Sequence, residues 1–184
     1  IDFGFDHPTA IVWGAINPEN GCFYVYDEYR ETRKTAVEHA IAIRERKHQP
    51  PMAYPHDGNR SFDGGDSMAQ QYRAEGVNLL MEHFTNPPDI SQTKGDIKIS
   101  AGITAMTRAM QKGLFKVFKS CHFWQQEYGM YHFGENGKIV DKEDDLMSAT
   151  RYAFQSQRFA EPVASKRRKR PWETKEKHNY DWVT

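Results

Sequence analysis

Two apolar, β-rich segments near the start of the chain place the strongest constraint on its fold. Residues 9–16 read Thr-Ala-Ile-Val-Trp-Gly-Ala-Ile, and residues 22–29 read Cys-Phe-Tyr-Val-Tyr-Asp-Glu-Tyr. The turn-forming cluster from Asn17 to Gly21 separates them. Because β-branched and aromatic residues favour strands and the connection is short, this pattern predicts a hairpin of two antiparallel strands.

Helix-like and strand-like segments alternate after the hairpin. Apolar residues recur at helical spacing, and Thr35 and Gly113 are suited to cap the first and third of these helices. The order predicts an α/β fold in which helices flank both faces of a mixed β-sheet. The expected helices are 35–47, 67–75, 96–112, 122–131 and 142–157, and the expected short strands are 52–54, 77–81 and 114–118.

Charge is distributed unevenly although it sums to zero. The 184 residues include 25 Lys or Arg and 25 Asp or Glu. Residues 165–184 hold an excess of basic residues, so the rest of the chain is acidic. Hydrophobic periodicity also ends near residue 160. We therefore expect a folded domain over 1–160 and a basic, aromatic-containing, flexible tail over 161–184.

Several classes of protein are excluded by composition. No apolar run reaches the roughly 18 residues that a membrane-spanning helix needs. Two cysteines, Cys22 and Cys121, are too few for a disulfide-rich scaffold or a multi-cysteine zinc site, and we expect both to be small core residues. The sequence opens on strand-like Ile1 with neither Met nor a signal peptide, which suggests a fragment of a longer polypeptide.

Acidic residues recur where the expected elements begin or end. Asp2 precedes the first strand, Asp57 follows the segment 52–54, and Asp144 and Asp145 open the last helix. Carboxylates at such positions can meet at one edge of a sheet, and oxygen ligands without thiolates suit Mg²⁺ or Mn²⁺. Each also has a purely structural interpretation, because Asp57 fits a turn and acids are favoured at a helix N-terminus.

An ordered set of short motifs carries a resemblance to a known family. The set comprises Ile-Asp-Phe-Gly-Phe-Asp-His-Pro-Thr-Ala at 1–10, Tyr-Pro-His-Asp-Gly-Asn-Arg at 54–60, 98–103, Cys121, Glu127-Tyr128, and 144–153. With it, residues 1–158 resemble the C-terminal nuclease domain of the large terminase subunit of tailed bacteriophages that package DNA by the headful mechanism. The resemblance implies a ribonuclease H-like fold and a metal-dependent endonuclease that cuts concatemeric double-stranded viral DNA.

The resemblance also implies which residues carry the chemistry. It places the catalytic metal ligands at Asp2, Asp57 and the Asp144/Asp145 pair, with two Mg²⁺ or Mn²⁺ ions at the phosphodiester. Which member of the pair binds directly stays open, as does an outer role for Ser148, where many relatives carry Asp. No Gly-x-x-x-x-Gly-Lys-[Ser/Thr] motif occurs, so the family's ATPase would lie before residue 1.

Residues near these acids form a second tier of candidates. Asp6 could help to hold a metal or could cap a turn. His7 and His56 flank the acids and could bind metal, move a proton or lie in ordinary surface loops. The candidates for contacting DNA phosphates, with solvated charge as the alternative, are Arg60, Lys94 and Lys98.

The basic tail offers a further set of contacts. It fits DNA phosphates, an acidic protein surface, or a merely solvated run, and aromatic residues favour a docking role. The resemblance suggests the portal protein as the docking partner. It further implies the terminase small subunit and the ATPase domain of the same full-length chain as partners, with no membrane. The tail residues concerned are Lys166, Arg167, Arg168, Lys169, Arg170 and Trp172.

Two other functions stay open at this level. A junction resolvase or transposase-like nuclease of the same fold would prefer branched DNA or defined ends. A non-catalytic portal-docking module would act through the tail alone. The resemblance implies action in the host-cell cytoplasm during phage assembly, without secretion.

Overall fold

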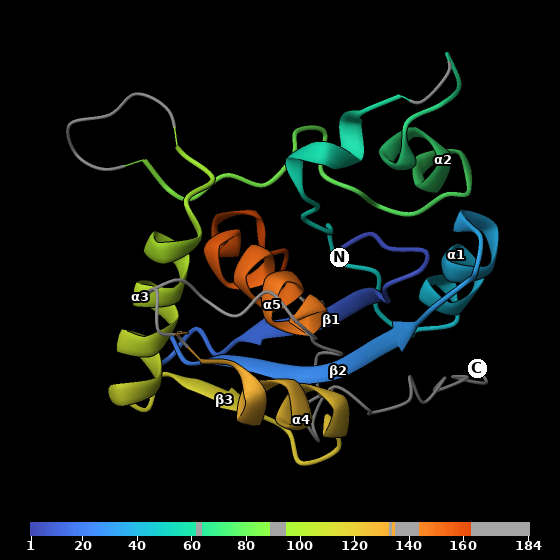
Figure 1. Ribbon diagram of the computed structural model, residues 1–184. Coiled ribbons are helices and arrows are strands. Elements are labelled where there is room, and N and C mark those ends of the chain that lie inside the picture. The colour runs from blue at the N-terminus through green and yellow to red at the C-terminus, as the bar shows by residue number, and fades with distance from the viewer. Residues whose placement is uncertain (62–63, 89–94, 133, 135–143, 163–184) are drawn as a thin grey trace, which may run out of the picture.

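A mixed sheet forms the centre of the fold (Figure 1). The computed structural model describes residues 1–61, 64–88, 95–132, 134 and 144–162. In it, β1 (Thr9–Ile16) and β2 (Phe23–Glu31) form the predicted antiparallel hairpin, with a register shift between Trp13 and Gly14. β3 (Phe115–Val117) pairs in parallel with β2, which gives the strand order β1-β2-β3.

Helices make up the rest of the regular secondary structure in the described residues. Their bounds lie close to the predicted segments, because apolar periodicity locates a helix better than it locates its ends. The α-helices are α1 (Ala36–Arg44), α2 (Met68–Ala74), α3 (Ile99–Gln111), α4 (His122–Met130) and α5 (Asp145–Gln155), and the 3₁₀ helices are η1 (His56–Asn59) and η2 (Gln157–Phe159).

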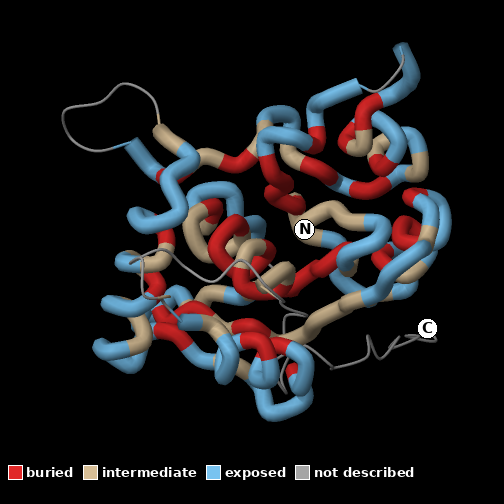
Figure 2. Tube along the Cα trace, in the orientation of Figure 1, coloured by how far each residue is buried: buried red, intermediate tan, exposed pale blue. Residues whose placement is uncertain are grey.

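Alternation along β1 divides the core between two faces of the sheet. Ile11 and Trp13 pack in one cluster with buried residues of α1 and α2. Ala10 and Val12 pack in a second cluster with α3, α4 and α5. The prediction of helices on both faces of a mixed sheet is therefore confirmed. Figure 2 shows buried residues running along β1 and along the side of α5 that faces it.

Two predicted helix ends are confirmed in detail. The Thr35 hydroxyl accepts a hydrogen bond from the Glu38 amide, and the Glu38 carboxylate accepts one from the Thr35 amide at 2.8 Å, which is a capping box. Gly113 follows α3 with φ of 69°, a left-handed conformation that glycine adopts without steric cost.

The predicted strands at 52–54 and 77–81 are wrong. The backbones of these segments pair only through an isolated parallel bridge between Met52 and Leu79. Proline on either side of 52–54, at Pro51 and Pro55, removes backbone donors and prevents a longer ladder. The Leu79 amide also bonds to the Val77 carbonyl at 2.8 Å, so the second segment is curled rather than extended.

The last part of the chain is described only as far as residue 162. The final helix begins at Asp145 rather than at 142, while 135–143 and the tail 163–184 lie outside the described residues. The expectation of a flexible tail therefore stays a prediction. Among the helices that the structure describes, none combines the length and the apolar character needed to cross a membrane.

Candidate metal centre

Asp2 is held beside the start of β1. Its backbone amide donates to the Ala10 carbonyl at 2.7 Å, and the Ala10 amide returns a bond to the Asp2 carbonyl at 3.0 Å. The Ile1 amino group donates to the Ala53 carbonyl at 2.9 Å. This pairing ties the N-terminal segment both to the sheet and to the segment that leads to Asp57.

Asp57 lies on η1, immediately after Pro55. The Arg60 amide donates to the Asp57 carbonyl at 2.9 Å, and the Gly58 amide donates to the Pro55 carbonyl at 3.1 Å. Gly58 is buried because the Phe3 ring covers it, and a Cβ atom there would lie 2.5 Å from that ring. The close approach brings Asp57 next to the segment that carries Asp2, while the Asp57 side chain stays exposed.

Asp144 and Asp145 lie at the start of α5. Asp145 is the first helical residue, where the helix dipole favours a carboxylate, and its side chain is 12% exposed. The Nδ1 atom of His7 lies 2.9 Å from its Oδ1 atom. Asp144 is half-buried at the N-cap position, and its carbonyl accepts from the amide of half-buried Ser148 at 2.8 Å.

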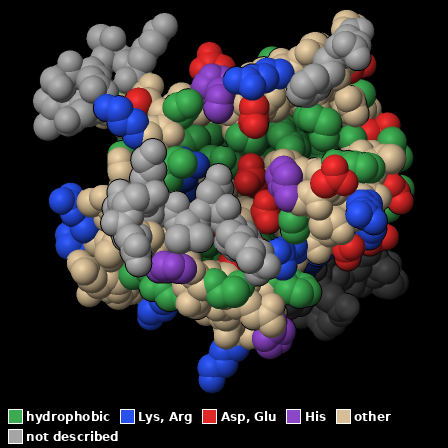
Figure 3. Space-filling model, in the orientation of Figure 1, with side chains coloured by type: hydrophobic (Ala, Val, Ile, Leu, Met, Phe, Trp, Pro, Cys, Tyr) green, Lys and Arg blue, Asp and Glu red, His purple; other side chains and the backbone are tan. Residues whose placement is uncertain are grey.

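Electrostatic coupling shows that three of these carboxylates share one neighbourhood. Burial raises the pKa of Asp2 to about 7; among the nearby charges, the carboxylates of Asp145 and Asp57 raise it while the Ile1 amine and His7 lower it. Acidic and histidine side chains gather near the middle of the face shown in Figure 3. A divalent cation would relieve this mutual repulsion.

The carboxylate oxygens are suitable ligands for a hard cation, although they do not converge on a single point in the structure. No group of three or more His, Cys, Asp or Glu side chains within the described ranges is arranged to hold a metal ion. The oxygen-only set of Asp2, Asp57 and Asp145 nevertheless matches the ligands of Mg²⁺ and Mn²⁺. Both thiols are buried in the core as expected, and burial raises the pKa of Cys121 to about 11, so it does not supply a thiolate.

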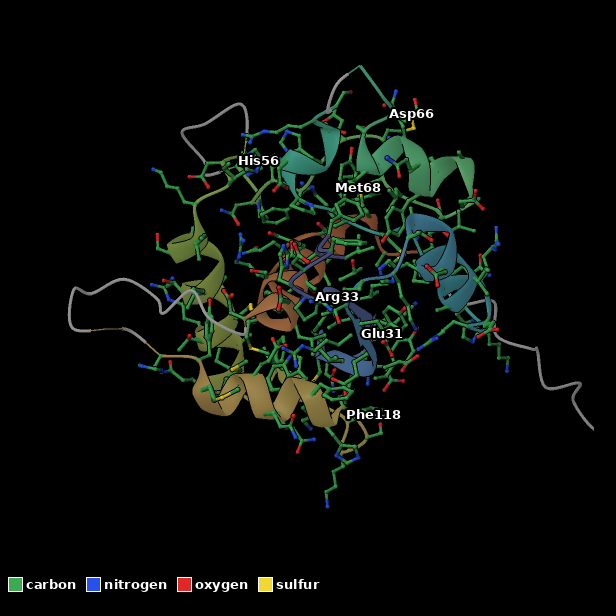
Figure 4. The ribbon with its side chains drawn as sticks, turned by 45° about the vertical axis from the view of Figure 1, so that its right-hand side comes forward. Glu31, Arg33, His56, Asp66, Met68 and Phe118 are labelled. Carbon is green, nitrogen blue, oxygen red and sulfur yellow. The ribbon has the colours of Figure 1, made fainter. Side chains whose placement is uncertain are left out.

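The second-tier candidates lie around this centre in different ways. Asp6 is exposed, as are His56 on η1 (labelled in Figure 4) and Arg60 directly after it. Lys98 precedes α3, and its ammonium lies 3.7 Å from a carboxylate oxygen of Asp96, so it carries a local ion pair. Lys94 and the tail residues 166–172 lie outside the described residues.

Two residues near the acids are not among the predicted site residues, although both lie in motifs that carry the family resemblance. Burial, then the charge of Asp2, raise the pKa of the Tyr152 hydroxyl above its usual range, which places Tyr152 beside the acids. Its spacing of seven from Asp145 puts both on one face of α5, a usable signal. Glu127 on α4 is 1% exposed, and burial raises its pKa to about 7. Glu127 belongs to the Glu127-Tyr128 motif of the resemblance, but the local sequence of α4 does not indicate that this glutamate is buried.

A cavity in the described structure lies apart from the four candidate acids. It has a volume of about 660 Å³ and runs along β1, with Phe23 and Tyr26 of β2 also in its lining. Its lining is mostly apolar and includes Val12, Ile16, Pro50 and Met52. None of the four candidate acids lines it, so this cavity is separate from the candidate metal centre.

Comparison with known proteins decides the family. The model of the terminase RNaseH-like domain matches residues 1–157. The chain belongs to this family. The large terminase subunit of Salmonella phage P22 is 34% identical to this terminase RNaseH-like domain over 160 residues, which cover 86% of the chain and 31% of that protein. The chain thus spans about a third of the length of the curated relatives it matches.

Solved structures agree with the family. The P22 large terminase nuclease domain matches this terminase RNaseH-like domain with a TM-score of 0.77 and 34% identity, covering 86% of this chain and 79% of that one. The nuclease domain of the bacteriophage SPP1 large terminase, solved with bound Mn, matches with a TM-score of 0.62 at 18% identity, covering 85% and 83%. The second match concerns the fold alone, and both agree with the ribonuclease H-like fold expected from the sequence.

Proposed function

We propose that this chain is a divalent-metal-dependent endonuclease domain that cuts concatemeric double-stranded viral DNA during genome packaging. The observation that carries the proposal is the approach of Asp2, Asp57 and Asp145 from three separate segments, close enough for two of them to raise the pKa of the third. Similarity to the P22 nuclease domain supports nuclease activity, and the bound Mn in the SPP1 domain supports metal use.

The chemistry proposed for the acids is that of a two-metal nuclease. Asp2, Asp57 and Asp145, together with Asp144, would hold two Mg²⁺ or Mn²⁺ ions. When bound, such ions activate water and stabilise the leaving oxygen of a phosphodiester. The chain's own part is to present ionised carboxylates, so Asp2 must release its proton. His7 orients the Asp145 carboxylate through their 2.9 Å contact.

Substrate and partners follow from the same proposal. Arg60, three residues after Asp57, and Lys98 are exposed and are proposed to contact phosphates of duplex DNA, with Lys94 in the same role. The tail residues 166–172 are proposed to bind DNA or the portal protein. The terminase small subunit and the ATPase domain of the full-length chain complete the set, acting in the host-cell cytoplasm during assembly.

A plasmid-nicking assay tests the proposal. Supercoiled DNA is incubated with the chain in EDTA, Mg²⁺ or Mn²⁺, beside Asp57→Asn and the matched surface variant Asp66→Asn. Asp66 lies at the turn before α2 (Figure 4) and is not one of the main charges that act on the pKa of Asp2. We expect metal-dependent nicking that Asp57→Asn abolishes and Asp66→Asn keeps. Nicking at equal rates by both variants would remove Asp57 from the site.

Substrate preference distinguishes the proposed endonuclease from a junction resolvase. A linear duplex and a four-way junction of the same sequence are cut in parallel under the same metal conditions. Comparable rates on the two substrates are expected. A strong preference for the junction would move the function to the resolvase class, with the same acids in place.

A further inference from the structure

The first turn of α5 takes its cap from another helix. Asp144 occupies the N-cap position, but its side chain makes no capping hydrogen bond. The Oε2 atom of Glu127, on α4, instead accepts from the Leu146 amide at 2.7 Å and from the Met147 amide at 3.4 Å. The first amides of a helix have no partner inside it, so Glu127 satisfies donors that a local cap would otherwise serve.

Glu127 is also anchored to the sheet. Its side chain is 1% exposed, and a carboxylate is rarely buried so fully without a partner. The Nε atom of Arg30, on β2, lies 3.1 Å from its Oε1 atom as an ion pair without the alignment of a hydrogen bond. One buried carboxylate therefore links β2, α4 and α5.

A second glutamate caps the start of the preceding helix, α4, in the same way. The carboxylate of Glu28, on β2, accepts from the Phe123 amide at 2.9 Å and from the Trp124 amide at 2.8 Å at the start of α4. The local N-cap, Cys121, again makes no side-chain cap. Two glutamates thus connect β2 to α4 and α4 to α5. Of these two glutamates, only Glu127 accepts hydrogen bonds from the residues that directly follow Asp145.

We propose that Glu127 is a positioning residue that sets the place of the Asp145 carboxylate opposite Asp2. The inference rests on the proposed metal-binding function. Leu146 directly follows Asp145, so a shift at the cap moves the backbone that carries the candidate ligand. A serine or threonine cap within α5 would satisfy the amides but would leave the helix untied to β2.

Mn²⁺ affinity, measured by titration calorimetry beside urea unfolding, tests this role. Glu127→Ala and Glu28→Ala each lose a helix cap, so both are expected to lower stability. Only Glu127→Ala is expected to weaken Mn²⁺ binding, by about 10- to 100-fold, as is usual when a residue that orients a metal ligand is removed. Equal Mn²⁺ affinity in these two variants would overturn the proposal.

Two glutamine variants test the same role if the alanine variants do not fold. Glu127→Gln keeps one acceptor oxygen but loses the charge, and is expected to weaken Mn²⁺ binding at least about threefold, with Glu28→Gln within twofold of wild type. Wild-type affinity in Glu127→Gln would contradict the positioning role. If the folded wild-type chain binds no Mn²⁺, the proposed function fails as well; if Asp145→Asn loses binding and the Glu127 variants keep it, only the positioning role fails.

Discussion

The Nδ1 atom of His7 lies 2.9 Å from the Oδ1 atom of Asp145, although 138 positions separate the two residues in the sequence. The contact joins the loop after Asp2 to the first residue of α5. His7 is 62% exposed and Asp145 only 12%, so an exposed side chain contacts a largely enclosed carboxylate. The pair therefore bears on the function of the centre more than on the stability of the fold.

Replacing His7 is expected to reduce nuclease activity while leaving the stability of the fold nearly unchanged. His7→Ala should change the free energy of unfolding by less than about 1 kcal/mol, because exposed ion pairs contribute little. Mn²⁺-dependent nicking should fall roughly tenfold, since the Asp145 carboxylate loses the group that orients it. Exposed His48 is the matched control, and equal nicking by His7→Ala and His48→Ala would count against the role.

The raised pKa of Asp2 predicts how stability depends on pH in metal-free solution. The folded-state pKa of about 7 lies above the ordinary value of 3.8, so the contribution of Asp2 to stability is full below the lower value and is lost as pH rises through the upper one. Asp2→Asn removes this loss. In EDTA at pH 8 the variant should be more stable than wild type by on the order of 3 kcal/mol, with the gap closing near pH 4.

Urea unfolding at both pH values measures the difference. The variant carries no ionisable group at position 2, so its stability should change less between pH 4 and pH 8 than that of the wild type. A variant less stable than the wild type at pH 8 would mean that charge repulsion at Asp2 is not the dominant effect.

The absence of a side chain at Gly58 allows the segment that carries Asp57 to pack closely against the segment that carries Asp2. A Cβ atom at this position would lie 2.5 Å from the Phe3 ring and 3.0 Å from the Tyr54 ring, and neither ring can yield easily. Gly58→Ala should therefore destabilise the fold by about 1–3 kcal/mol and reduce nicking, because η1 and Asp57 must shift.

Gly129 on α4 is the matched control for that change. Apart from its chain neighbours and the backbone of its own helix, no described heavy atom lies within 4 Å of a Cβ built there, so Gly129→Ala should stabilise the helix by up to about 1 kcal/mol. Thermal unfolding of the two variants compares them directly. The packing argument fails if Gly58→Ala is as stable as wild type.

Metal binding should raise the stability of the folded chain. Mn²⁺ at about 100 times its dissociation constant should add ~2.7 kcal/mol to the free energy of unfolding, and EDTA should remove the gain. Asp57→Asn should lose most of this increment while Asp66→Asn keeps it. An increment that survives in Asp57→Asn would place the ion elsewhere.

Local patterns predicted the elements whose signals are contained in a few neighbouring residues. The hairpin from Thr9 to Glu31 and the capping box at Thr35 are of this kind, because alternation and capping act over short spans. The family resemblance added the ribonuclease H-like fold and the set Asp2, Asp57 and Asp144/Asp145. The segments 52–54 and 77–81 were misjudged because prolines and a tight turn overrode their apolar composition.

The sequence by itself determined the mixed α/β fold, the family and the acids that merit testing. Only the tertiary structure decided that His7 contacts Asp145, that Phe3 covers Gly58, and that the cap of α5 comes from Glu127. Each of these contacts joins residues far apart in the chain. Their partners are selected by how the helices pack on the sheet, and no local periodicity encodes that packing.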